Sequence, residues 1–92
     1  MYTKDFDLNW KEYFEKLDNS VKVKIINKMK QILAGLPGRH LERGLPYFVE
    51  EVDQYRICYK SDEENKIRRF YFVGDHKEYL KWIGKQEITL RD

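Results

Sequence analysis

This sequence has few of the residues from which disulfide frameworks and metal centres are built. It holds one cysteine, Cys58, and two histidines, His40 and His76. A single cysteine excludes an internal disulfide and a cysteine-based zinc site, and neither histidine has a carboxylate at metal-ligand spacing. We therefore expect no metal and no cofactor. Cys58 lies inside a strand pattern, so we interpret it as a packed structural thiol rather than a nucleophile.

Long apolar runs and internal repeats are also missing. No stretch approaches the roughly 18 apolar residues that a membrane span needs. The start, residues 1–7, is charged and does not have the pattern of a signal peptide. We therefore expect a cytoplasmic protein without contact to a membrane. A length of 92 residues predicts one small domain over residues 1–92.

Charge is abundant but unevenly spread along the chain. Charged residues make up 37% of the sequence and hydrophobic residues 41%, a balance that indicates a soluble, globular protein rather than a disordered one. The formal net charge is only +2, yet residues 20–43 carry six Lys or Arg and one Asp or Glu. Residues 66–92 carry seven Lys or Arg and four Asp or Glu. These basic segments suit an anionic partner, or they form ordinary solvated surface, and both interpretations stay open.

Hydrophobic spacing predicts an α+β fold. Residues 2–7 alternate as a short, half-exposed strand, and from Leu8 apolar residues recur at helical spacing. The apolar stripe from Val21 to Leu33 predicts a second helix, which Gly35 and Pro37 end. A short connection makes the two helices an antiparallel hairpin, and neither stripe can be buried without a sheet.

The second half of the chain predicts that sheet. Strand patterns cover residues 47–52, 55–60 and 66–73, and the short turns between them make a meander of hairpins. Residues 76–86 return to helical spacing. We therefore expect a mainly antiparallel sheet, with the helical hairpin on one face and a short C-terminal helix.

Arg56 is the first candidate for a functional residue, because a charged side chain inside an apolar strand needs a partner or a ligand. Strand alternation places it opposite to its apolar neighbours at positions 55, 57 and 59, which we expect the helices to cover. Arg56 then lies on an uncovered, concave sheet face, where a phosphate could bind. The alternative is an ion pair with Glu50 or Glu51 on the neighbouring strand.

The last strand pattern ends in Gly-Asp-His-Lys, residues 74–77. His76 can exchange a proton near neutral pH, and Lys77 can hold a phosphate oxygen. The alternative is a simple turn in which Asp75 caps the final helix. Tyr79 and Trp82 could stack on a nucleic-acid base, although their helical spacing also suits a core.

Other basic residues are weaker candidates. Arg39, His40 and Arg43 lie in the connection of residues 35–46, which is rich in glycine and proline, and all three could bind phosphate. Arg68 and Arg69 are neighbours in a strand and point to opposite faces, so at most one of them can join a site with Arg56.

Four sequence blocks resemble the RelE/ParE toxin superfamily in their order and spacing. They are YTKDFD (2–7), LDNSVKVKIINKMKQIL (17–33), GLPYFVEEVDQYRICY (44–59) and FYFVGDHKEYLKW (70–82). The resemblance covers nearly the whole chain and implies a small fold similar to microbial ribonucleases. It also implies a toxin that cleaves mRNA in the ribosomal A site, inhibits translation and is neutralised by a cognate antitoxin.

The resemblance also implies roles for single residues. Arg56 matches a strand arginine that contacts the scissile phosphate, and His76 falls where relatives place a basic or histidine catalytic residue. Glu50 and Glu51 stand where RelE has lysines, and one of them could act as a carboxylate base. Trp82 falls near a catalytic tyrosine of RelE, but it cannot transfer a proton as tyrosine can. The implied catalytic residues are Arg56, His76, Lys77, Glu50 and Glu51, and the implied RNA-binding residues are Arg39, His40, Arg43, Tyr79 and Trp82.

The implied activity is that of a metal-independent endoribonuclease, with mRNA, the ribosome and an antitoxin as partners. The expected reaction is attack of an RNA 2′-hydroxyl on the adjacent phosphate. Two alternatives stay open. One is a ParE-like toxin that inhibits gyrase, and the other is a degenerate, antitoxin-binding module in which Glu50 or Glu51 locks Arg56. The four lysines of the second helix offer a surface for an acidic antitoxin or for rRNA: Lys22, Lys24, Lys28 and Lys30.

Overall fold

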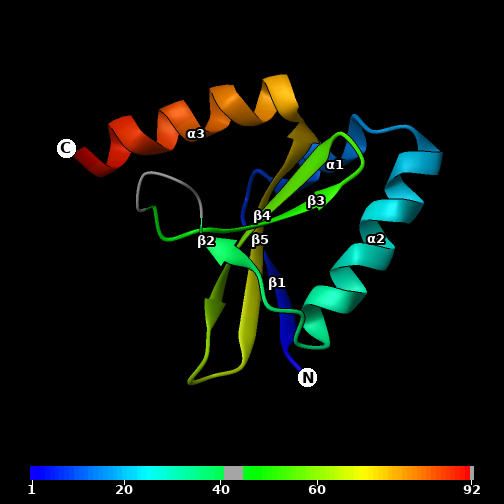
Figure 1. Ribbon diagram of the computed structural model, residues 1–92, viewed down its shortest axis with the longest axis vertical. Helices are drawn as coiled ribbons and strands as arrows, with labels where there is room; N and C mark the ends of the chain where they lie inside the picture. The colour runs from blue at the N-terminus through cyan, green and yellow to red at the C-terminus, as the bar shows by residue number, and fades with distance from the viewer. Residues whose placement is uncertain (41–44, 92) are drawn as a thin grey trace.

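The computed structural model shows a five-stranded mixed sheet with helices on both faces (Figure 1). It describes residues 1–40 and 45–91, and for residues 39–40 and 87–91 it describes the backbone alone. The elements in chain order are β1 (Thr3–Phe6), α1 (Trp10–Glu15), α2 (Asn19–Leu33), β2 (Arg39–His40), β3 (Phe48–Val52), β4 (Tyr55–Asp62), β5 (Ile67–Asp75) and α3 (His76–Arg91). Within the described ranges, no helix is long and apolar enough to cross a membrane.

The strands lie in the order β1-β5-β4-β3-β2. Strand β1 runs parallel to β5, and all other neighbours are antiparallel. The predicted meander of three strands is thus present as β3, β4 and β5, and the polar N-terminal strand lies at an edge, as expected. Strand β2 has only two residues and pairs with β3, whereas the sequence predicted a plain connection there. Two residues are too few to produce an alternating pattern.

Helices α1 and α2 cover one face of the sheet. Their apolar side chains meet those of β4 and β5 in a core cluster of Trp10, Ile25, Met29, Ile32, Ile57, Tyr59, Phe70 and Val73. Helix α2 ends at Leu33, and two residues later Gly35 has a φ of 112°, which suits glycine. The N–H groups of Gly35 and Leu36 donate to the carbonyl oxygens of Ile32 and Gln31, both at 3.1 Å. This pair of hydrogen bonds is a Schellman motif, so the predicted end of the helix is confirmed.

Arg68 of β5 stabilises the same end of α2. Its buried guanidinium donates hydrogen bonds to the carbonyl oxygens of Ile32, at 2.8 Å, and Leu36, at 2.9 Å. Arg69, the next residue, binds Asp5 at 2.7 Å on the edge strand. The two arginines therefore do point to opposite faces, and both have structural partners.

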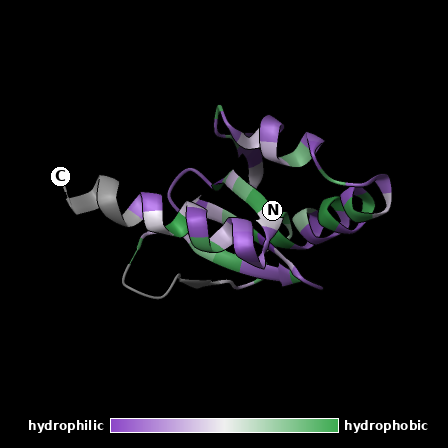
Figure 2. Ribbon diagram, turned by 90° about the horizontal axis from the view of Figure 1, so that it is seen from above, coloured by the Kyte–Doolittle hydropathy of each residue, from purple (hydrophilic) through white to green (hydrophobic). Residues whose placement is uncertain are grey.

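Helix α3 covers the opposite face, and the expectation that helices leave this face uncovered is wrong. The second core cluster joins Leu45, Tyr47, Cys58, Phe72, Trp82 and Ile83. The helix runs to Arg91 instead of ending near residue 86, and Trp82 and Ile83 pack onto the sheet. Figure 2 shows α1 and α3 on opposite sides of the strands, with polar and apolar segments alternating along each helix. The end of this face near Arg56 is open and forms a pocket.

Candidate active site

Arg56, His76 and Lys77 line one open pocket of ≈ 500 Å³. Asp53, Gln54 and Asp75 complete its wall. The pocket lies where the β3–β4 turn, the first residues of β4 and the start of α3 come together (Figure 1). The two residues that the sequence singled out, Arg56 and His76, therefore face the same space, whereas their chemical roles stay predictions.

The strand register explains why Arg56 is accessible. Arg56 pairs with Glu51 on one side and with Gly74 on the other. A Cβ atom at Gly74 would lie 2.7 Å from Cζ of Phe72 and 3.1 Å from Cβ of Glu78. Glycine is therefore required for α3 to start this close to β5, and no side chain at position 74 fills the space beside Arg56.

Among the described residues, the Arg56 guanidinium has two polar contacts. Its Nη1 donates to the carbonyl oxygen of Tyr55 at 3.2 Å, and its Nε lies 3.7 Å from Oε1 of Glu51. The second distance is too long for a hydrogen bond, and the Glu51 side chain is 53% exposed. A guanidinium has five N–H donors, so these contacts leave it able to bind a phosphate.

The turn before α3 fixes the positions of His76 and Lys77. The N–H of Glu78 donates to Oδ1 of Asp75 at 2.9 Å, and the N–H of Asp75 donates to Oε1 of Glu78 at 3.2 Å. This reciprocal pair is a capping box. Asp75 therefore does cap the helix, as the alternative interpretation held. Because the cap leaves His76 and Lys77 exposed at a helix N-terminus, it also supports an anion-binding site.

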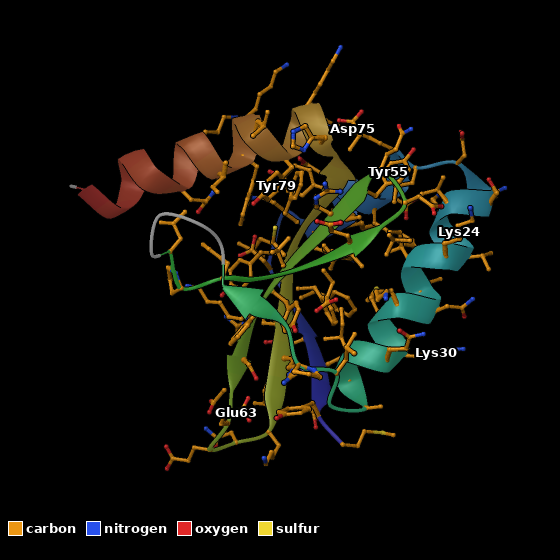
Figure 3. All side chains as sticks on the ribbon, in the orientation of Figure 1. Lys24, Lys30, Tyr55, Glu63, Asp75 and Tyr79 are labelled. Carbon is orange, nitrogen blue, oxygen red and sulfur yellow. The ribbon has the colours of Figure 1, made fainter. Side chains whose placement is uncertain are left out.

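The sequence did not identify Asp53 as part of this pocket. Asp53 forms the β3–β4 turn with a φ of 53°, which aspartate tolerates. Its Oδ2 lies 2.8 Å from Nζ of Lys24 on α2, and this hydrogen bond raises the pKa of Lys24. Figure 3 shows Lys24 on α2, facing the turn that precedes Tyr55. Lys24 thus offsets a carboxylate that would repel an anion, and only its position in a basic helix was visible in the sequence.

Two other predicted site residues lie away from the pocket. Glu50 pairs with Ile57, so it belongs to the face covered by α1 and α2, and only Glu51 shares a face with Arg56. Trp82 is 6% exposed, and its ring packs against Phe72 at 5.1 Å and Tyr47 at 4.9 Å. This burial does not fit the expected stacking of Trp82 on a base.

The remaining predicted site residues do not line the pocket of Arg56 in the described part of the structure. The ring of Tyr79 lies 6.2 Å from that of His76 and is half-buried. Arg43 and the side chains of Arg39 and His40 lie outside the described residues. In the part of the chain that the structure describes, no three His, Cys, Asp or Glu side chains are grouped as metal ligands. Burial raises the pKa of Cys58, as expected for a structural thiol.

No protein-family model and no curated protein matches this sequence. Solved structures do match its fold. A chain of the intact Escherichia coli RelBE toxin–antitoxin complex superposes with a TM-score of 0.72 and 22% identity, over 82% of this chain and 96% of that one. The isolated E. coli RelE toxin superposes with a TM-score of 0.68 and 23% identity, over 90% of this chain and 99% of that one.

A toxin–antitoxin complex RelBE from Mycobacterium tuberculosis gives a TM-score of 0.70 and 20% identity, over 82% of this chain and 98% of the other. This chain has the RelE fold. In this chain the end of β5 lies beside the start of α3, and the pocket of Arg56 and His76 is found there. Identities of 20% to 23% establish the fold alone, so the chemistry of the pocket depends on its own side chains.

Proposed function

We propose that this protein is the toxin of a toxin–antitoxin system and a metal-independent endoribonuclease that cleaves mRNA, in the ribosomal A site, to inhibit translation. The observation that supports the proposal most is the pocket in which Arg56, His76 and Lys77 meet at the N-terminus of α3. Arginine and lysine bind phosphate, and histidine transfers protons near neutral pH. The RelE fold agrees with this assignment.

The proposed reaction is an internal transesterification of RNA. The 2′-oxygen forms a bond to the adjacent phosphorus while the bond from phosphorus to the 5′-oxygen breaks, which leaves a cyclic phosphate and a free 5′-hydroxyl. Arg56 and Lys77 stabilise the charge on the phosphate oxygens. Protonated His76 gives its proton to the leaving 5′-oxygen. DNA lacks the 2′-hydroxyl and is not cut.

Glu51 is the best candidate for the base that takes the 2′-proton. It shares a sheet face with Arg56, whereas Glu50 lies on the other face. Its carboxylate lies 3.7 Å from the Arg56 guanidinium, so it sits beside the group that would hold the phosphate. We therefore assign Glu51, and not Glu50, to the general-base step.

The partner of such a toxin is an antitoxin, and the solved relatives include toxin–antitoxin complexes. Helix α2 offers a suitable surface, because Val23 and Ile26 are exposed apolar residues beside Lys30. An acidic, amphipathic segment would complement such a surface. We propose this surface as one contact of the antitoxin.

A second candidate function is a non-catalytic, antitoxin-binding module. The contact between Arg56 and Glu51 is the observation in its favour, because a paired arginine is less available to a phosphate. This candidate predicts no growth arrest when the protein is produced without its antitoxin.

Inducible expression in bacteria tests these functions together. We expect growth arrest and new mRNA 5′ ends by primer extension, and we expect the Arg56→Ala/His76→Ala variant to abolish both. The matched control is Lys4→Ala/Lys11→Ala, which removes two exposed charges outside the pocket. A double variant in the pocket that arrests growth as strongly as the parent contradicts the assignment. DNA breaks instead of cleaved mRNA would indicate gyrase inhibition.

A further inference from the structure

A second, smaller pocket of ≈ 250 Å³ lies between α1 and α3, and we call it the α1–α3 groove. Lys16, which directly follows α1, lines it on one side, and Lys81 and Lys85 of α3 line it on the other. Tyr13, Phe72 and Trp82 form its aromatic floor. No role follows for this groove from the reaction proposed above.

The sheet edge explains why the groove exists. Strand β1 pairs with β5 only as far as Phe70, so β5 has no strand neighbour on that side beyond this residue. Tyr13 of α1 reaches this free edge instead and packs edge-on against Phe72 at 4.9 Å. From the other face, Trp82 stacks on the same ring at 5.1 Å. Residues of α1 and α3 thus contact the Phe72 ring from two sides, and the groove lies between the two helices.

The charges of the groove suit an anion. Three ammonium groups face one carboxylate, that of Glu78, which already accepts a hydrogen bond from the N–H of Asp75. Lys81 and Lys85 are four residues apart on one helix, an arrangement that costs about 0.2–0.5 kcal/mol in helix stability. Lys16 adds a third positive charge from the end of α1.

The start of α3 connects the groove to the pocket of Arg56. His76 and Lys77 line the pocket, and the next turn of the helix, with Glu78 and Lys81, lines the groove. We propose that the α1–α3 groove binds a second phosphate of the same single-stranded RNA, flanking the phosphate that is cleaved. The identity of this ligand rests on the proposed function. Lysines hold a phosphate as point charges.

Binding of an uncleavable RNA tests the groove separately from cleavage. The probe is a labelled single-stranded RNA with 2′-O-methyl groups, and its affinity is measured by fluorescence anisotropy over a series of salt concentrations. We expect Lys16→Gln/Lys81→Gln to weaken binding about tenfold and to reduce the salt slope by about 0.7 for each phosphate that is no longer neutralised. The control Lys4→Gln/Lys11→Gln removes the same charge elsewhere on the surface and is expected to change affinity less than about twofold.

Each outcome decides for or against the groove. An unchanged affinity of the groove variant, or an equal decrease in the control, overturns the inference. If the groove variant loses affinity only for an oligoglutamate peptide and not for the RNA, the inference is overturned as well, because the groove is then a site for an acidic protein segment. Thermal melts followed by circular dichroism verify that both variants fold. If the groove variant binds RNA more weakly but the parent produces no cleaved mRNA in cells, the groove stands and the nuclease proposal fails.

Discussion

Gly74 is the point where the fold and the candidate active site depend on each other most directly. A Cβ atom there would lie 2.7 Å from Cζ of Phe72, and Phe72 cannot move aside because Tyr13 and Trp82 hold its ring. The Glu78 side chain, 3.1 Å away, belongs to the capping box that orients His76. A Gly74→Ala variant therefore has to displace either the core or the first turn of α3.

The size of the effect follows from two opposing contributions. Overpacking a well-filled core costs about 1–3 kcal/mol, while replacing glycine stabilises by about 0.4–1 kcal/mol through the unfolded chain. We expect a net decrease of about 1–2 kcal/mol in the free energy of unfolding. In a domain of this size, that decrease corresponds to a lowering of Tm by roughly 4–16 °C.

Gly84 provides a matched control in the same helix. It lies in the interior of α3, and a Cβ atom there would meet nothing within 4 Å. Gly84→Ala should therefore stabilise the protein by about 0.5–1 kcal/mol, since alanine is the better helix former. Calorimetry of both variants is the assay. Equal, favourable shifts in both would refute the close packing described at Gly74.

Three further predictions concern single side chains. Arg68→Met removes hydrogen bonds to two carbonyl oxygens at the end of α2 and should cost about 2–4 kcal/mol in urea unfolding, with Arg68→Lys intermediate. Lys24→Met exposes the Asp53 carboxylate beside the pocket and should weaken binding of the uncleavable RNA severalfold, and Lys24→Met/Asp53→Asn should restore it. Burial raises the pKa of Cys58, so the thiol should resist iodoacetamide at pH 8 until the protein unfolds, and rapid labelling of the folded form would contradict this.

Much of the fold was predictable because it depends on local periodicity. The apolar stripe of α2, its glycine end and the three-stranded meander all follow from spacing that a short window of sequence contains. The position of α3 was not predictable in this way. Its apolar residues indicate a helix, but which face of the sheet it covers depends on contacts such as that of Trp82 with Tyr47, which is 35 positions away in the chain. The same limit applies to Lys24 and Asp53, which meet across 29 positions.

The candidate site was predictable to the extent that strand alternation and turn chemistry determine it. Alternation placed Arg56 on the correct face, and the Gly-Asp-His-Lys turn placed His76 at the start of a helix. Alternation puts Glu50 and Glu51 on opposite faces, but the register between β3 and β4 decides that Glu51 is the one on the face of Arg56, and this register was not read from the sequence. The burial of Trp82 was not predictable either, because it depends on which residues pack against its ring.

The pairing of Arg56 with Glu51 does not prevent Arg56 from binding a phosphate. An ion pair at 3.7 Å with a carboxylate that is 53% exposed contributes about 0–1 kcal/mol, because water screens it. A phosphate between Arg56 and Lys77 forms charge-assisted hydrogen bonds that are shorter and stronger than this contact. It would therefore displace Glu51 from the guanidinium. The displaced carboxylate then lies beside the bound phosphate, which is where a base for the 2′-hydroxyl is needed, so the same contact serves the proposed chemistry.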